Sequence, residues 1–94
     1  MEFWGAYDYN ELKGVIATNE SRKHICCFFV KAECHRQGIG KKLWEYLLNN
    51  SQNKIITVNS SPYAVPIYHK LGFVDTDIEQ LSEGMKYTPM RFER

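Results

Sequence analysis

The sequence predicts an α+β protein, a mixed α/β sandwich whose sheet is mostly antiparallel with one parallel crossover. Three strand-like segments come first, an amphipathic helical stripe follows them, and a short β-branched segment follows the helix. Because strand, helix and strand in that order are typical of a parallel crossover connection, we expect a mixed sheet. The chain has 94 residues, of which 44% are apolar, and this predicts one small domain over residues 1–94.

The first half of the chain contains three expected strands. Residues 2–8 are rich in aromatic side chains, and residues 12–18 and 24–30 are rich in apolar and β-branched ones. Polar turn residues separate the three segments, so we expect a hairpin followed by a third antiparallel strand. The third segment is almost continuously apolar and is expected to be buried on both faces. Gly14 predicts a bulge or a close approach of the backbone within the second strand.

The second half begins with a helix and a strand. Apolar side chains at positions 39, 43, 44, 47 and 48 form a helical stripe, which predicts a helix over residues 39–48. Residues 54–59 then predict a short strand, and the crossover is expected at the loop before the helix. A second, short helix is expected from about Tyr63 to Leu71, with Gly72 as its left-handed cap.

The last third of the chain predicts two more strands, over residues 74–81 and 85–92, with a turn at residues 82–84. Pro89 lacks a backbone donor, so it predicts either an edge position or a bulge in the final strand. Five aromatic residues of the first half are expected to form core, although some could line a tunnel for a ligand instead. They are Phe3, Trp4, Tyr7, Phe28 and Phe29.

Composition excludes several functional classes. A formal net charge of +1 argues against a general nucleic-acid binder. No stretch is long enough to span a membrane and the N-terminus does not resemble a signal peptide, so a cytoplasmic location is expected. The cysteines, Cys26, Cys27 and Cys34, show no Cys-x-x-Cys spacing, which predicts neither a disulfide framework nor a metal site. We expect the three cysteines to be small apolar residues in a reducing compartment, and Cys34, beside a basic loop, is the one candidate for a reactive thiol.

The segment His35–Lys42, named here the glycine loop, predicts an anion site. It lies between a strand signal and a helix signal, and the first turn of a helix presents backbone N–H groups at the positive end of the helix dipole. Gly38 and Gly40 lack Cβ atoms, so a diphosphate can approach the backbone closely. The Walker pattern is excluded because Lys41 is followed by Lys42, and the third glycine of the dinucleotide fingerprint is absent.

The glycine loop resembles the acyl-CoA pyrophosphate loop of the GNAT superfamily of N-acetyltransferases, whose pattern is Gln/Arg-x-x-Gly-x-Gly/Ala. A second segment, Tyr68–Phe73, reads Tyr-His-Lys-Leu-Gly-Phe and is similar to the family's Tyr-x-Lys-Leu-Gly-Phe segment. The resemblance implies a GNAT-like fold with acetyl-CoA as co-substrate. The resemblance covers nearly the whole chain. It does not include the strand and two helices with which GNAT domains usually begin, because the sequence has no counterpart of them before the first expected hairpin.

The resemblance also implies which residues bind the co-substrate. Main-chain N–H groups of residues 36–41 would hold the diphosphate, and main-chain groups of residues 28–30 would pair with the pantetheine arm. The implied cofactor-binding residues are Phe28, Phe29, Val30, His35, Arg36, Gln37, Gly38, Ile39, Gly40, Lys41, Lys42, Ser61 and Tyr68. Two of them depart from the family pattern, because His35 stands for Gln or Arg and Ser61 for a frequent Asn.

For catalysis, the resemblance implies direct attack of an amine on the thioester. Tyr68 stands at the position of the family's general-acid tyrosine, and a phenol with a reference pKa of about 10 is protonated at neutral pH. Its alternative role is ring packing in the core. No general base is evident, since Glu33, His24 and His69 are expected to be solvated or structural.

Two classes of function therefore remain open. The first is an acyl-CoA-dependent N-acetyltransferase with an amine acceptor. The second is a non-catalytic acyl-CoA-binding or interaction module of GNAT fold, which the absent helices, His35 and the missing base suggest. Nucleic acid and membrane are not expected as partners, and a homodimer is expected because the missing first strand would leave an exposed sheet edge.

Overall fold

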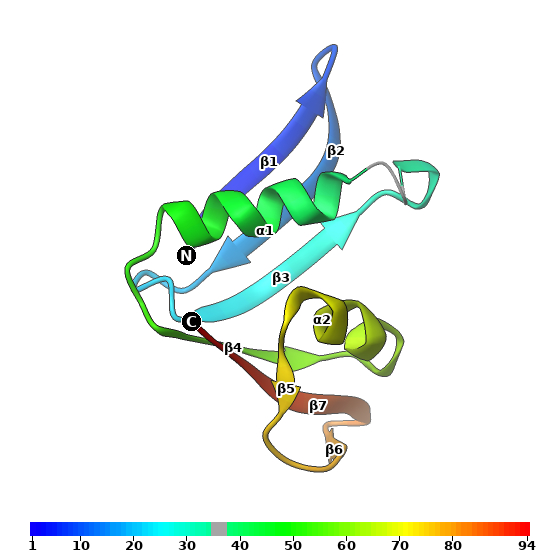
Figure 1. Ribbon diagram of the computed structural model, residues 1–94. Coiled ribbons are helices and arrows are strands. Elements are labelled where there is room, and N and C mark those ends of the chain that lie inside the picture. The colour runs from blue at the N-terminus through cyan, green and yellow to red at the C-terminus, as the bar shows by residue number, and fades with distance from the viewer. Residues whose placement is uncertain (35–37) are drawn as a thin grey trace. The chain divides into compact units, whose positions relative to one another are not determined.

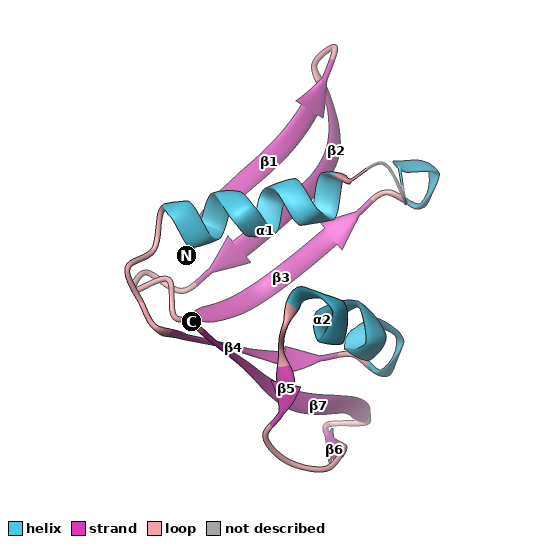
Figure 2. Ribbon diagram, viewed as in Figure 1, coloured by secondary structure: helices cyan, strands magenta, loops and turns pink. Residues whose placement is uncertain are grey.

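The computed structural model describes residues 1–34 and 38–94. Within them the chain forms two compact units, Met1–Asn53 and Lys54–Arg94. Each unit combines antiparallel strands with an α-helix (Figures 1 and 2).

The first unit begins with a three-stranded antiparallel meander. Its strands are β1 (Glu2–Asp8), β2 (Glu11–Thr18) and β3 (His24–Val30), with β2 in the middle. The turn between β1 and β2 is tight because Tyr9 and Asn10 have φ angles of 50° and 67°. Two consecutive positive φ angles are typical of a type I′ turn, whose twist matches that of the paired strands. The three predicted strands are confirmed, with β2 beginning at Glu11 rather than at residue 12.

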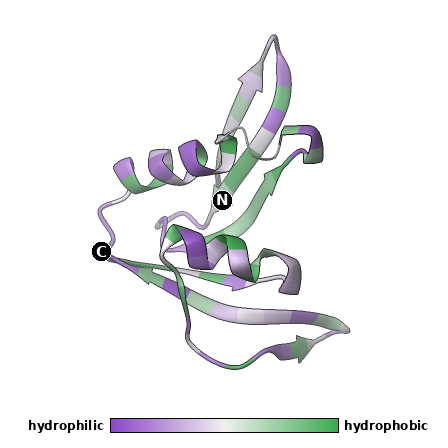
Figure 3. Cartoon of the chain, turned by 45° about the vertical axis from the view of Figure 1, so that its right-hand side comes forward, coloured by the Kyte–Doolittle hydropathy of each residue, from purple (hydrophilic) through white to green (hydrophobic). Residues whose placement is uncertain are grey.

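A short 3-10 helix, Ala32–Cys34, follows β3, and helix α1 (Ile39–Asn49) then lies across one face of the meander (Figure 1). Figure 3 shows polar and apolar bands alternating along α1, as expected for a helix with one covered side. Leu43, Trp44 and Leu47 are buried. The predicted helical stripe is therefore confirmed, since it faces the sheet.

Gly14 lies close both to α1 and to the backbone of β3. A Cβ atom added to Gly14 would stand 3.0 Å from the Phe29 carbonyl oxygen and 3.2 Å from Leu43 Cδ1. The register with β1 also shifts between Ala6 and Tyr7, which pair with Gly14 and Leu12. Both readings of Gly14, a close backbone approach and a bulge beside it, are confirmed.

The expectation that β3 is buried on both faces is wrong. Cys26, Cys27 and Phe29 are exposed, and only Ile25 in this strand is fully buried. Within the first unit, α1 covers one face of the meander, and alternate side chains of β3 point to the other. An apolar run indicates a strand but does not tell which face receives a cover.

The expectation of an aromatic core is wrong for three of its five residues. Phe3, Tyr7 and Phe29 are 64%, 69% and 54% exposed, whereas Trp4 and Phe28 are half-buried. The strand register puts the exposed three on the face of the meander opposite α1, because alternate residues of each strand share a face.

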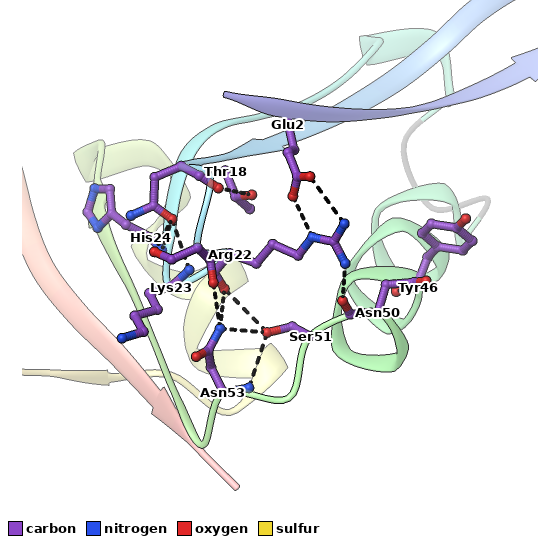
Figure 4. Close-up of polar contacts among 11 residues, drawn as sticks. Glu2, Thr18, Arg22, Lys23, His24, Tyr46, Asn50, Ser51 and Asn53 are labelled. Carbon is purple, nitrogen blue, oxygen red and sulfur yellow. Dashed lines mark hydrogen bonds and ion pairs between the residues drawn. The ribbon is translucent and has the colours of Figure 1, made fainter.

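Arg22 ties together three parts of the first unit (Figure 4). Its guanidinium donates hydrogen bonds to both carboxylate oxygens of Glu2 on β1 and to the main-chain oxygen of Asn50 after α1. It also lies 5.3 Å from the centre of the Trp4 ring, a distance typical of a cation–π contact. The Glu2 pKa is lowered, chiefly by the hydrogen bond from Arg22, and the Arg22 pKa is raised by the same bond. Arg22 holds this position with a φ of 58°.

The second unit has β7 at its centre. Its elements are β4 (Ile55–Ser60), a 3-10 turn (Pro62–Ala64), α2 (Val65–Leu71), β5 (Val74–Asp75), β6 (Gln80–Ser82) and β7 (Met85–Glu93). Strand β7 pairs antiparallel with β4 along one side and with β5 and β6 along the other. The chain thus has the β3, α1, β4 order that the crossover requires.

In this unit, the single strand predicted over residues 74–81 and the edge alternative for Pro89 are wrong. The strand expected over residues 74–81 is divided into β5 and β6, and between them Asp77 Oδ1 accepts a hydrogen bond from the Ile78 N–H at 2.7 Å. Such a local turn competes with the sheet ladder. Pro89 does not lie at an edge, since β7 is paired on both sides. It accepts a hydrogen bond from the Thr76 N–H at 2.9 Å but has no N–H to return, and the ladder with β5 stops there.

Helix α2 begins at Val65, two residues after the predicted start at Tyr63. The 3-10 turn Pro62–Ala64 precedes it, and Ser61 caps that turn by accepting a hydrogen bond from the Ala64 N–H at 3.3 Å. Gly72 ends α2 with a φ of 104°, which confirms the predicted left-handed cap.

Candidate functional site

The N-terminus of α1 has the geometry of an anion site. Gly38 precedes the helix in a left-handed conformation with a φ of 78°, and no side chain caps the first turn in the described structure. The Lys42 N–H donates to the Gly38 carbonyl at 3.0 Å, which is the first hydrogen bond of the helix. The N–H groups of residues 39–41 precede that bond and therefore have no intrahelical acceptor. Such groups bind anions at the positive end of a helix dipole.

The two glycines of the loop have different local roles. Gly38 needs its conformational freedom, because a positive φ strains other L-residues. Gly40 lies inside α1, and a Cβ on it would stand 3.6 Å from Val30 Cγ2 and 3.8 Å from the Phe28 ring. These are ordinary contact distances. The side of Gly40 on which a Cβ would stand therefore faces β3 and has room for a methyl group. His35, Arg36 and Gln37, the first residues of the predicted loop, lie outside the described residues.

Lysines flank this helix N-terminus. Lys41 is exposed and its Nζ lies 4.0 Å from Glu45 one turn along the helix, and Lys42 is also exposed. Lys31, before the loop, has its Nζ 2.9 Å from Glu11. That hydrogen bond is the main cause of the lowered pKa of Glu11 and of the raised pKa of Lys31. Lys31 is therefore committed to an ion pair, and Lys41 and Lys42 supply the exposed positive charge next to the first turn.

The three predicted pantetheine-binding residues differ in where their main-chain groups point. Phe29 is paired with Val15 of β2, and the Lys31 N–H donates to the Lys13 carbonyl at 2.9 Å. This register turns the N–H and C=O of Phe29 toward β2, whereas those of Phe28 and Val30 point to the opposite side of β3. Phe28 and Val30 are also the residues whose side chains lie nearest to Gly40.

The other two predicted site residues, Ser61 and Tyr68, belong to the second unit. Ser61 is exposed at the end of β4, where its hydroxyl caps the 3-10 turn. Tyr68 on α2 is only 5% exposed, and its ring meets the Phe73 ring edge-on at a centroid distance of 5.2 Å and an interplanar angle of 69°. The packing role considered for Tyr68 is thus part of its environment.

Sequence reasoning missed Phe73 as the neighbour of Tyr68. The signal was present, because an apolar residue directly after a left-handed glycine cap often contacts the helix residue five positions before it.

Two of the side chains that were expected to be solvated or structural, those of His69 and Glu33, are so placed. His69 Nε2 lies 2.7 Å from Asp75 Oδ1, and the Glu33 side chain is exposed. Cys34, the candidate reactive thiol, is buried with 4% of its surface exposed, whereas Cys26 and Cys27 are exposed. Within residues 1–34 and 38–94, no three His, Cys, Asp or Glu side chains gather closely enough to hold a metal ion. In the same part of the chain, neither helix has the length and apolar character needed to cross a membrane.

A comparison with models of known protein families identifies one family. The model of the acetyltransferase (GNAT) domain family matches residues 1–94. The comparison with curated proteins gave no match. Among solved structures, a GCN5-related N-acetyltransferase from Rhodopseudomonas palustris is similar with a TM-score of 0.85 and 19% identity, over 98% of this chain and 61% of that protein.

Two further solved structures show the same fold. An N-acetyltransferase from Staphylococcus aureus gives a TM-score of 0.78 at 14% identity, over 95% of this chain and 68% of that one. An acyl-CoA N-acyltransferase from Pseudomonas aeruginosa gives 0.74 at 16% identity, over 96% and 66%. The chain thus spans about two thirds of the length of these proteins, and the predicted GNAT-like α+β fold is confirmed. The chain belongs to the GNAT acetyltransferase family.

Proposed function

We propose that this chain is an acyl-CoA-dependent N-acetyltransferase, which moves an acetyl group from acetyl-CoA to an amine by direct attack. Family membership supports acyl transfer in general. The observation that carries the proposal is the left-handed Gly38 before an α1 first turn that lacks a side-chain cap in the described structure. This geometry suits a diphosphate, since both its shape and its charge match a row of N–H groups that have no intrahelical acceptor.

In the proposed binding mode, the N–H groups of residues 39–41 hold the diphosphate, and the other residues of the glycine loop, His35–Lys42, belong to the same proposed cofactor-binding set. Lys41 and Lys42 lie close to the phosphates and add attraction that depends on salt. Of the three predicted pantetheine-binding residues, Phe28 and Val30 pair with the arm through their main chain, whereas the main-chain groups of Phe29 are turned toward β2. Ser61 and Tyr68 are the remaining proposed cofactor-binding residues. Residues 1–94 then act as a single GNAT-like domain.

The proposed reaction needs few protein groups. The amine nitrogen attacks the thioester carbonyl carbon, a tetrahedral intermediate collapses, the carbon–sulfur bond breaks, and the CoA thiolate takes up a proton while the new ammonium loses one. Tyr68 is the proposed proton donor to the thiolate. Its position on α2, one turn before the helix end, is fixed by packing, which a general acid requires.

Calorimetric titration with acetyl-CoA tests the binding half of this proposal. Dephospho-CoA and ATP, titrated in parallel, show whether the diphosphate alone accounts for recognition. Acetyl-CoA should also raise thermal stability, by about 2.7 kcal/mol at one hundred times the Kd. The absence of both heat and stabilisation would contradict the proposed role of the glycine loop.

Turnover tests the catalytic half. Release of CoA thiol is followed with acetyl-CoA and a panel of primary amines comprising spermidine, lysine and a peptide with a free N-terminus. Tyr68→Phe should reduce kcat by about a hundredfold while the Kd for acetyl-CoA stays unchanged, because general-acid catalysis contributes about 10²–10⁴ in rate.

A second candidate function is a non-catalytic acyl-CoA-binding or interaction module of the same fold. The deep burial of Tyr68 against Phe73 favours it, since a packed tyrosine needs no catalytic role. It predicts acetyl-CoA binding without turnover of any amine in the panel. The cytoplasmic location and the homodimer stay predictions; sedimentation that shows only monomer across the micromolar range would contradict the dimer.

A further inference from the structure

The end of α2 has the hydrogen-bond pattern of a Schellman motif. The Gly72 N–H donates to the His69 carbonyl at 3.1 Å, and the Phe73 N–H donates to the Tyr68 carbonyl at 3.0 Å. In this motif the residue after the left-handed glycine commonly makes an apolar contact with the residue five positions earlier. Here those two residues are Phe73 and Tyr68, and their rings meet edge-on at 5.2 Å. The Tyr-His-Lys-Leu-Gly-Phe segment is therefore a local motif in which Tyr68 and Phe73 contact each other through both a main-chain hydrogen bond and their rings.

A third aromatic ring, that of Phe92, packs against Phe73. Phe73 is 2% exposed, and the Phe92 ring on β7 lies 5.7 Å from it. A Cβ on Gly72 would stand 3.1 Å from Phe92, so the cap itself is packed against β7. Phe73 is consequently held from two sides, and it can restrain the ring of Tyr68 in turn.

We propose that Phe73 is a positioning residue for acyl transfer, which fixes the ring of Tyr68 and hence the direction of its hydroxyl. This inference rests on the proposed function, because it requires Tyr68 to be the general acid. A tyrosine hydroxyl lies at the tip of a rigid ring, so a small rotation about the side-chain torsions displaces the oxygen markedly. Misplacement of a catalytic group by about 1 Å can cost about a hundredfold in rate. An edge-on aromatic pair has a preferred geometry that an aliphatic side chain lacks, so an aliphatic residue in place of Phe73 restrains that rotation less.

The test is a double-mutant cycle on kcat. Phe73→Leu, Tyr68→Phe and the double variant are compared with the wild type, with acetyl-CoA and the amine of the panel that turns over fastest. We expect Phe73→Leu to lower kcat about tenfold with little change in the KM for acetyl-CoA. In the Tyr68→Phe background, Phe73→Leu should change kcat less than twofold, because no hydroxyl remains to be positioned. Phe73→Met provides a second variant without a ring if the leucine variant folds poorly.

Ile16→Val is the matched control for lost packing. Ile16 is fully buried on β2 in the first unit, whereas Tyr68 and Phe73 belong to the second, so the loss of one methyl group at Ile16 lowers thermal stability and leaves both residues of the pair unaltered. It should leave kcat unchanged.

The failures of the two proposals are distinguishable. An equal loss of kcat from Phe73→Leu with and without the Tyr68 hydroxyl, or no loss in either, would overturn the positioning role while the role of Tyr68 stands. A Tyr68→Phe variant with wild-type kcat would overturn both.

Discussion

Replacing Gly38 with alanine should destabilise the protein, whereas replacing Gly40 with alanine should stabilise it. Gly38 has a φ of 78°, and among the described residues nothing beyond its chain neighbours lies within 4 Å of an added Cβ, so we assign the cost to backbone strain. An L-residue in the left-handed region costs about 1–2 kcal/mol, and the lower entropy of the unfolded alanine chain returns about 0.4–1 kcal/mol. The net loss for Gly38→Ala is thus about 0.5–1 kcal/mol.

Gly40 lies within α1, where alanine is favoured over glycine by up to about 1 kcal/mol. The added Cβ would meet Val30 at 3.6 Å and Phe28 at 3.8 Å, which are ordinary contacts, so no steric cost offsets that gain. The free energies of unfolding of the two variants should therefore lie on opposite sides of the wild-type value and differ from each other by about 1–2 kcal/mol. For a domain of this size, each kcal/mol corresponds to about 4–8 °C in Tm.

Urea unfolding followed by circular dichroism measures both free energies of unfolding. Gly38→Asn is the matched control, since asparagine tolerates the left-handed region and should recover most of the loss. Equal stability of the two alanine variants, or a larger loss at Gly40, would refute the assignment of backbone strain to Gly38 and of helical packing to Gly40.

Three further predictions concern the helix cap and the Arg22 contacts. Gly72→Ala should cost more stability than Gly38→Ala, because a φ of 104° is combined with a Phe92 ring atom 3.1 Å from the new Cβ; urea unfolding checks this ranking. Arg22→Gly should lower Tm less than Arg22→Ala, because the φ of 58° favours glycine; the reverse order in a thermal melt would speak against strain there. Glu2→Gln should lower Tm at pH 7 but not well below pH 4.5. The Glu2 pKa is depressed below 4.5, so its stabilisation is present above that pH and is lost as the pH falls through the folded-state value. A difference in Tm between the two proteins that stays the same from pH 7 to well below pH 4.5 would contradict this link to Arg22.

Local features of the fold could be predicted from the sequence because their causes are local. The α1 stripe, the left-handed cap at Gly72 and the strand over residues 24–30 each follow from neighbouring residues. The exposure of Phe3 and Tyr7 could not be predicted, since an apolar pattern marks a side chain as fit for burial but does not supply the element that covers it.

The break between β5 and β6 illustrates a second kind of failure. Residues 74–81 carry enough apolar side chains to suggest one strand, but the Asp77 side chain forms a local turn and Pro89 withholds a donor from the facing strand. The first cause was readable from the sequence. The second required the register between two segments that are more than ten residues apart in the chain.

The positions of candidate site residues on their helices were predictable where the spacing of neighbouring residues alone decides them. The strand, glycine and helix context of Gly38 indicated the helix N-terminus, and the position of Tyr68 before Leu71 and Gly72 placed it in the last turn of α2. The main-chain directions of Phe28, Phe29 and Val30 were not predictable, because they depend on the pairing register with β2.

The most direct test of the proposed acyl-CoA site is a titration of ¹⁵N-labelled protein with acetyl-CoA, read out as backbone amide shifts in NMR spectra. The account predicts that the amides of Ile39, Gly40 and Lys41 shift most, since their N–H groups begin α1 beyond Gly38 and would receive the diphosphate. Dephospho-CoA keeps the diphosphate, so it should shift the same amides. A weaker affinity for dephospho-CoA would measure the contribution of the 3′-phosphate. Saturable shifts confined to other parts of the chain, or none at millimolar acetyl-CoA, would contradict the account.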